Sequence, residues 1–284
     1  MPDMCELFSF EKSKFYAEKL ETKYPFLTCT ILGRSYMGRA IFSFSLGCPS
    51  DSVVIVGGTG GKSSQTSLVL YRFLDRVCDS VYSGKELSGI NFSALIKKFG
   101  ITVVPCLNPD STEIASGFER IPEIFGDCDK ISDWNANSAG IDIDLNFSSD
   151  WRKEKMDSLE KNIIFSSHEG FPGNTKESEP ETRAFVSLCR RRNFRSCLTL
   201  RNSDINTIYY RRKDRQPPPS AMMAKILASS CCFSASVKEM PACPSRWFCD
   251  EFSKPAFLIE TEKQDCAEAV YQRLEEALVL MSVM

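Results

Sequence analysis

The chain has 284 residues, a formal net charge of −2 and 43% hydrophobic residues. This length and apolar content suffice for a full hydrophobic core, and the near-neutral charge argues against a nucleic-acid or membrane-surface protein. The first residues carry charges rather than an apolar signal segment, and the 13 cysteines include no Cys-x-x-Cys pair. We therefore expect reduced thiols, a cytoplasmic location and no membrane span.

Hydrophobic periodicity and turn signals predict helices and strands that alternate along the chain. In chain order these are helix 10–24, strands 27–32, 39–46 and 53–56, helices 63–78 and 93–99, strand 101–104, helix 178–191, strands 197–200 and 207–210, helix 220–230, strand 257–259 and helix 264–283. The alternation predicts a single three-layer α/β/α domain over residues 1–284, with a mixed, mostly parallel twisted sheet.

Local signals set several expected boundaries. We expect Gly100 to cap helix 93–99, Ser178 to cap helix 178–191, and the prolines Pro217–Pro219 to precede helix 220–230. The segments 108–151 and 166–178 are predicted to be long irregular loops, which in compact domains are usually functional.

A glycine-rich turn joins strand 53–56 to helix 63–78 and reads Val56-Gly-Gly-Thr-Gly-Gly-Lys-Ser63. A strand, tight turn and helix form the place where α/β proteins put ligand sites. Gly61-Lys62-Ser63 matches the end of a P-loop, but position 56, where that motif requires glycine, is Val56. Strand 101–104 also ends in Pro-Cys rather than in a carboxylate. A P-loop-like nucleotide binder stays open as one interpretation, and a metal-binding turn that lacks its ligands is the other.

Five blocks along the chain together resemble the zinc carboxypeptidases of the carboxypeptidase A-like fold. They are Lys23-Tyr-Pro25 with Ser35-Tyr-Met-Gly-Arg39, Val53 to Lys62, Val104-Pro-Cys-Leu-Asn-Pro-Asp110, Trp134-Asn-Ala-Asn-Ser-Ala-Gly-Ile-Asp-Ile-Asp-Leu-Asn-Phe147, and Pro255-Ala-Phe-Leu-Ile-Glu260. The third to fifth are similar to the family's V-P-x-x-N-P-D-G, W-x-A-N-x-R-G-V-D-L-N-R-N-F and P-x-F-T-I-E motifs. Phe171-Pro-Gly173 and Ser178-Glu-Pro-Glu-Thr-Arg183 resemble the bacterial branch that cleaves cell-wall peptides. The resemblance covers nearly the whole chain and implies the family's fold.

The resemblance also implies a catalytic apparatus that this sequence lacks at most positions. The family holds zinc with His-x-x-Glu and a later histidine, and a glutamate acts as general base on the zinc-bound water. The His-x-x-Glu positions fall on Gly60 and Ser63, and the later histidine falls on Arg201. The Asn-Arg pair that clamps the substrate's carboxylate becomes Asp144 and Leu145. Glycine has no ligand atom and arginine cannot ligate a cation.

Only the general-base position, Glu260, matches the family. The single histidine, His168, lies away from these positions, and we expect it to be an exposed loop residue. The sequence therefore predicts no zinc cofactor and a pseudoenzyme with a vestigial Glu260. Its cleft would include Lys62, Asn135, Asp144, Leu145 and Arg201 and would bind a peptide or protein, with an oligomeric state that the sequence does not define.

The replaced residues bring positive charge to the site, since Lys62 and Arg201 stand near or at the ligand positions. A buried, unpaired Glu260 would be costly, so we predict that Arg201 or Lys62 pairs with it within about 4 Å. Asp144 should repel a terminal carboxylate, which favours a neutral or cationic peptide end. A second interpretation is an active metallocarboxypeptidase whose unusual site gathers a hard cation with Asp142, Asp144 and Glu260.

Overall fold

The computed structural model describes residues 4, 7–122, 125, 131–210, 220–236, 238–263 and 266–284. Two features noted in the sequence, the Pro217–Pro219 run and the predicted start of the last helix at Gln264, lie outside this part. None of the helices in the described ranges combines the length and the apolar character needed to cross a membrane.

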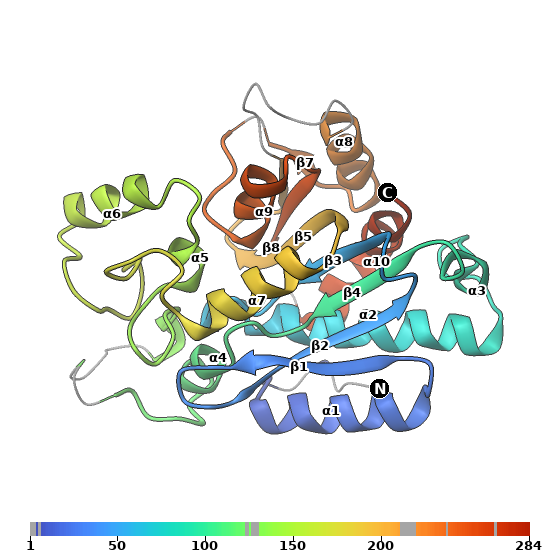
Figure 1. Ribbon diagram of the computed structural model, residues 1–284, viewed down its shortest axis with the longest axis horizontal. Helices are drawn as coiled ribbons and strands as arrows, with labels where there is room; N and C mark the ends of the chain where they lie inside the picture. The colour runs from blue at the N-terminus through green and yellow to red at the C-terminus, as the bar shows by residue number, and fades with distance from the viewer. Residues whose placement is uncertain are drawn as a thin grey trace.

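An eight-stranded mixed sheet forms the centre of the molecule, with strand order β1-β2-β4-β3-β5-β8-β6-β7 (Figure 1). The strands pair in parallel from β4 through β3 and β5 to β8, whereas β1–β2, β2–β4 and β6–β8 are antiparallel. Their bounds are β1 Thr28–Arg34, β2 Ala40–Gly47, β3 Ser52–Val56, β4 Gly100–Val104, β5 Phe194–Ser203, β6 Thr207–Tyr210, β7 Ser234–Ala235 and β8 Ala256–Glu262. This confirms the predicted mixed, mostly parallel α/β sheet.

Helices cover both faces of the sheet because the central strands are buried on both sides. Val53 and Ile55 of β3 pack with α1, α2, α8 and α10, whereas Val54 and Val56 pack with α7 and α9 (Figure 1). The first group of helices spans α1 Phe10–Lys23, α2 Ser64–Ser83, α8 Ser220–Ser230 and α10 Ala267–Val283. The second group spans α7 Pro180–Arg191 and α9 Pro244–Phe252.

The expected helix boundary at Gly100 is wrong. The helix predicted over 93–99 is the single turn α3, Phe92–Leu95, and Gly100 begins β4. A Cβ atom on Gly100 would stand 2.2 Å from the carbonyl oxygen of Cys48. Glycine is therefore required there by the close approach of the β2–β3 connection and not by a helix end.

The segment 108–151 contains more structure than predicted. Asn108 caps α4, Pro109–Ala115, because its side chain accepts a hydrogen bond from the Ser111 amide. A single turn, α5 (Ile143–Asn146), and the helix α6 (Trp151–Glu160) follow, and both lie to one side of the sheet (Figure 1).

The expected Ser178 cap is also wrong: the residue before α7 is Glu179, and the Ser178 hydroxyl donates to the Glu179 carboxylate instead.

The strand register positions the candidate site. β5 and β8 are parallel neighbours, and Arg201 lies directly beside Glu260 in their register. β3 ends one strand away, and its chain continues through the glycine-rich turn into the 3-10 turn η1, Gly61–Ser63, and then α2. Arg201, Glu260 and the glycine-rich turn, to which the resemblance assigns the ligand and general-base positions, therefore meet at one edge of the sheet.

Candidate functional site

A cavity of about 570 Å³ opens at the carboxyl ends of β3, β5 and β8. We call it the cleft. It brings together each cleft residue predicted from the sequence. Its lining includes Lys62, Ser63, Asn135, Asp142, Asp144, Leu145, Arg201 and Glu260, together with residues of α6, the 239–242 segment and α9.

Arg201 pairs with Glu260, as the sequence predicts. Its Nε and Nη2 atoms donate to Glu260 Oε1 over 3.0 and 2.5 Å, and Nη1 lies 3.4 Å from Asp144 Oδ2. Nη1 also donates to the Ala242 carbonyl over 3.2 Å. Burial would lower the pKa of Arg201, but the Asp144 and Glu260 carboxylates outweigh it and raise that pKa. The guanidinium is therefore a fixed positive charge between two carboxylates.

The space beside Gly60 is filled by Asn135. A Cβ atom on Gly60 would stand 2.1 Å from Asn135 Oδ1, so no larger residue fits while the amide keeps this position. Gly60 has an extended backbone (φ −150°, ψ 166°), which any residue can adopt. The Asn135 amide is held there because its Nδ2 donates to Asp142 Oδ2 over 3.3 Å. The need for glycine at position 60 is thus a matter of space.

The Lys62 side chain forms an ion pair with Glu169 over 2.6 Å. Of the two predicted partners of Glu260, the structure therefore shows Arg201 and not Lys62. The amides of the glycine-rich turn are engaged within the protein. The Gly58 amide donates to Thr66 Oγ1 and the Gly61 amide to Ser111 Oγ, over 2.9 and 2.6 Å. A phosphate-binding loop uses its amides and lysine for the ligand, so this arrangement gives a nucleotide site no support.

Two neighbouring carboxylates, Asp142 and Asp144, lie buried beside Arg201. Burial and the proximity of Asp144 raise the pKa of Asp142 to about 7. Burial also raises the pKa of Asp144, although Arg201 and the Thr59 hydroxyl oppose the shift. Thr59 donates to Asp144 Oδ2 over 3.2 Å. These shifts favour the protonated forms of the two groups, so Asp142 carries only part of its negative charge near neutral pH.

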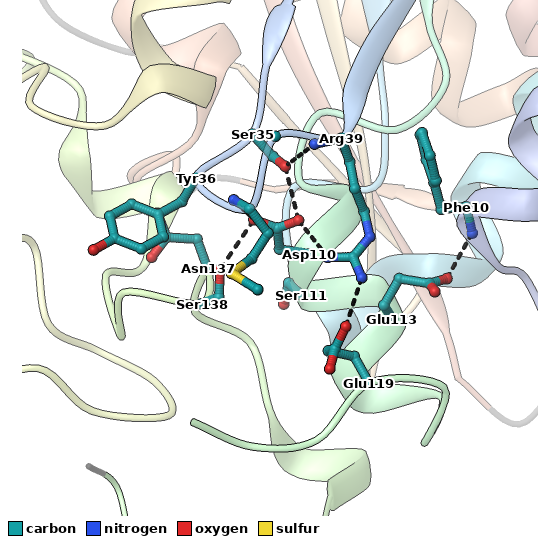
Figure 2. A network of polar contacts seen from close by, with 12 residues as sticks. Phe10, Ser35, Tyr36, Arg39, Asp110, Ser111, Glu113, Glu119, Asn137 and Ser138 are labelled. Atoms are coloured by element: carbon teal, nitrogen blue, oxygen red, sulfur yellow. Dashed lines mark hydrogen bonds and ion pairs between the residues drawn. The ribbon is translucent and has the colours of Figure 1, made fainter. Parts of the chain in front are cut away.

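A buried polar network holds the 134–140 loop that carries Asn135. Asp110, at the start of α4, accepts hydrogen bonds from Ser35, Arg39 and Ser138, as Figure 2 shows. Arg39 continues to Glu119 over 2.8 Å (Figure 2). The network connects the β1–β2 turn, α4 and the loop, so it fixes one wall of the cleft.

Some cleft residues could not be found from the sequence. Glu169 pairs with Lys62, Thr59 with Asp144, and Arg246 with Glu154 and Asp150. Thr59 lies in the glycine-rich turn and Glu169 in the 166–178 loop, but no motif indicates these pairings, which only the folded loops bring about. His168 is exposed, as expected.

The fold, with its eight-stranded mixed sheet and a cleft at the carboxyl ends of the central strands, is that of a carboxypeptidase-like hydrolase. The zinc carboxypeptidase family model matches residues 14–236, and the chain belongs to that family. Among solved structures, thrombin activatable fibrinolysis inhibitor has a TM-score of 0.75 at 15% identity, over 99% of this chain and 74% of that one. Murein-tripeptide amidase MpaA from Escherichia coli O157 has a TM-score of 0.58 at 18% identity, over 89% of this chain and 91% of that one.

Two curated bacterial proteins are similar in sequence. The uncharacterized protein YqgT of Bacillus subtilis (strain 168) is 24% identical over 181 residues, which are 60% of this chain and 47% of that protein. Gamma-D-glutamyl-L-diamino acid endopeptidase 1 of Lysinibacillus sphaericus is 23% identical over 185 residues, 62% of this chain and 46% of that protein. The chain spans about half the length of these curated relatives.

Proposed function

We propose that this protein is a catalytically inactive member of its family that keeps a peptide-binding cleft without a zinc site. The observation that carries the proposal is the ion pair between Arg201 and Glu260. Arg201, to which the resemblance assigns the third ligand position, is a cationic side chain. It is bonded to Glu260, to which the resemblance assigns the general-base position. Two charge-assisted hydrogen bonds to Glu260 Oε1 make this carboxylate the partner of a fixed cation, where the family's general base would act on a zinc-bound water.

The other ligand positions support the same proposal. Gly60 offers no donor atom and its side-chain space holds the Asn135 amide, while the Ser63 hydroxyl accepts a hydrogen bond from the Asn202 amide over 3.2 Å. Within the described ranges, no group of three or more histidine, cysteine or acidic side chains is placed to hold a metal ion. The residues present do not fit a zinc ion, which needs His, Cys or carboxylate donors in a tetrahedral set.

The alternative hard-cation site at Asp142, Asp144 and Glu260 gains no support from the geometry. The Arg201 guanidinium lies between Asp144 and Glu260 and bonds to both, so a metal ion there would face a fixed positive charge. The family's use of peptides, and the endopeptidase named among the relatives, favour a peptide or peptide-bearing protein as the bound partner.

Peptide hydrolysis measured in the presence of added zinc tests the proposal. We expect no release of the C-terminal residue from unmodified peptides and no cleavage of γ-D-glutamyl-diamino acid peptides. Turnover that disappears with a chelator and returns with zinc would contradict it. A Glu260→Gln preparation, measured in parallel, shows whether any residual turnover comes from this site or from a contaminant.

A further inference from the structure

The cationic side chains that line the cleft are all engaged by carboxylates. Lys62 pairs with Glu169, Lys153 with Glu239, Lys263 with Asp204, Arg246 with Glu154, and Arg201 with Glu260. Among the described residues of the cleft, none therefore offers an uncommitted cation to a ligand's carboxylate. The family's clamp positions, Asp144 and Leu145, offer a negative and an apolar side chain instead.

Carboxyl groups outnumber cations at the inner wall of the cleft. Asp142, Asp144 and Glu260 are each no more than 6% exposed, and Arg201 is the cation bonded to Asp144 and Glu260. Asp142 is held by neutral donors, namely Asn135 Nδ2 over 3.3 Å and the amides of Gly170 and Asp144 over 3.2 Å each. A further cation would be attracted to this wall.

Asp144 provides the atom that would meet such a cation. Its side chain is 7% exposed and lines the cleft, and its Oδ2 accepts from Thr59 and Arg201. Its Oδ1 is buried and accepts no hydrogen bond from any described residue. A buried carboxylate oxygen without a donor is unfavourable, and an ammonium group supplies both the missing hydrogen bond and the missing charge.

We infer that the cleft binds a peptide residue that carries a primary ammonium group, with Asp144 as its counter-ion. The ligand class is a lysine-type side chain on a peptide that presents no free carboxylate to the clamp positions. This inference rests on the proposed peptide-binding function and specifies what the cleft recognises. The cleft would then bind a cationic group of the ligand, whereas the family's clamp binds the terminal carboxylate of its substrate.

Calorimetric binding of three matched probes tests the inference. Acetyl-Ala-Lys-amide carries the ammonium, acetyl-Ala-norleucine-amide replaces it with an apolar end, and acetyl-Ala-(Nε-acetyl-Lys)-amide keeps the length without the charge. We expect the lysine probe to bind at least about tenfold more tightly than either neutral probe. Equal affinity of the three probes for the wild-type protein, or no binding by any of them, would overturn the inference.

Two variants then locate the effect. Asp144→Asn should remove the preference for the lysine probe, whereas Glu251→Gln, which removes an equal charge on the outer surface of α9, should keep it. Thermal unfolding of each variant confirms that it is folded. A preference that survives in Asp144→Asn would overturn the assignment to Asp144. Zinc content and probe cleavage are measured on the same samples. If the wild-type protein is zinc-free and inactive but shows no preference for the lysine probe, only this inference is contradicted. Zinc-dependent cleavage of a probe would contradict the proposed function.

Discussion

At the scale of single residues, Glu260 shows how a buried carboxylate is neutralised. Glu260 is 5% exposed and would be costly to bury alone. Arg201 supplies the opposite charge from the neighbouring strand. Under the proposed function, in which Arg201 replaces a metal ligand, this one side chain both removes a ligand and compensates part of the charge that the metal would have carried.

Removal of the Arg201 charge should destabilise the protein. Arg201→Met leaves Glu260 and Asp144 buried without their cation, and we expect the free energy of unfolding to fall by about 3 kcal/mol. Adding Glu260→Gln should recover part of this loss. Urea unfolding measures both changes.

Arg190 is the matched control for Arg201. It also contacts two carboxylates, Glu177 and Glu251, but its side chain is 47% exposed. Arg190→Met should therefore cost no more than about 1 kcal/mol. A comparable loss in the two arginine variants would show that the cleft pair is no more important than a surface pair.

The buried Glu181 should make stability depend on pH. Burial raises its pKa to about 7 from an ordinary value of 4.5. The folded state then holds a proton that the unfolded state has released between these two values. Stability from this group is therefore fully present below about 4.5 and is lost as the pH rises through about 7.

The expected loss is up to about 3 kcal/mol of unfolding free energy between pH 4.5 and 7.5. Glu181→Gln should flatten this slope, measured by urea unfolding at several pH values. Asp142 changes its protonation in the same range, so some slope should remain. A Glu181→Gln curve parallel to that of the wild type would contradict a protonated Glu181.

At the scale of elements, the turn between β3 and α2 packs closely around Gly60, which we propose replaces a metal ligand. Gly60 keeps an extended backbone, but the Asn135 amide occupies the space that a side chain would need. The network around Asp110 holds the loop that delivers Asn135 (Figure 2). Reintroducing a histidine at position 60 alone would therefore require the loop side chain to move.

A double-mutant cycle tests this packing. Gly60→Ala should destabilise the protein by about 1–3 kcal/mol, because its Cβ overlaps Asn135 Oδ1. The same change in an Asn135→Ala background should cost much less, which gives a coupling energy of about 1 kcal/mol or more by thermal or urea unfolding. Strictly additive losses would mean that the two residues do not share this space.

The elements with strong periodicity or buried β-branched runs could be predicted from the sequence, as α1, β3, β6 and α8 show. The short helix α4 was not predicted, because Asn108-Pro-Asp suits both a loop and a capped helix start. α6 was missed because it is polar and has little buried surface, whereas α9 was missed because its apolar face is only nine residues long. The pairing of Glu260 with Arg201 or Lys62 followed from the family resemblance and the charges at those positions. The roles of Asn135 and Glu169 depend on loop conformations that local sequence does not determine.

At the scale of the whole molecule, the family fold and the family chemistry are separable. The fold corresponds to those of thrombin activatable fibrinolysis inhibitor and murein-tripeptide amidase MpaA, at 15% and 18% identity. Hydrophobic patterning specifies these layers through many residues, whereas the catalytic metal depends on three. The proposed function therefore combines the loss of the metal ligands with a retained fold and a cleft of about 570 Å³.

Zinc stoichiometry is the most direct test of the central claim. The protein is incubated with excess zinc, desalted and measured by inductively coupled plasma mass spectrometry. A quadruple variant, Gly60→His, Ser63→Glu, Arg201→His and Asn135→Ala, serves as the reference for a rebuilt site. We predict much less than one zinc ion per chain in the natural protein. One retained zinc ion per chain that is lost when Glu260 and Asp144 are neutralised would contradict the account.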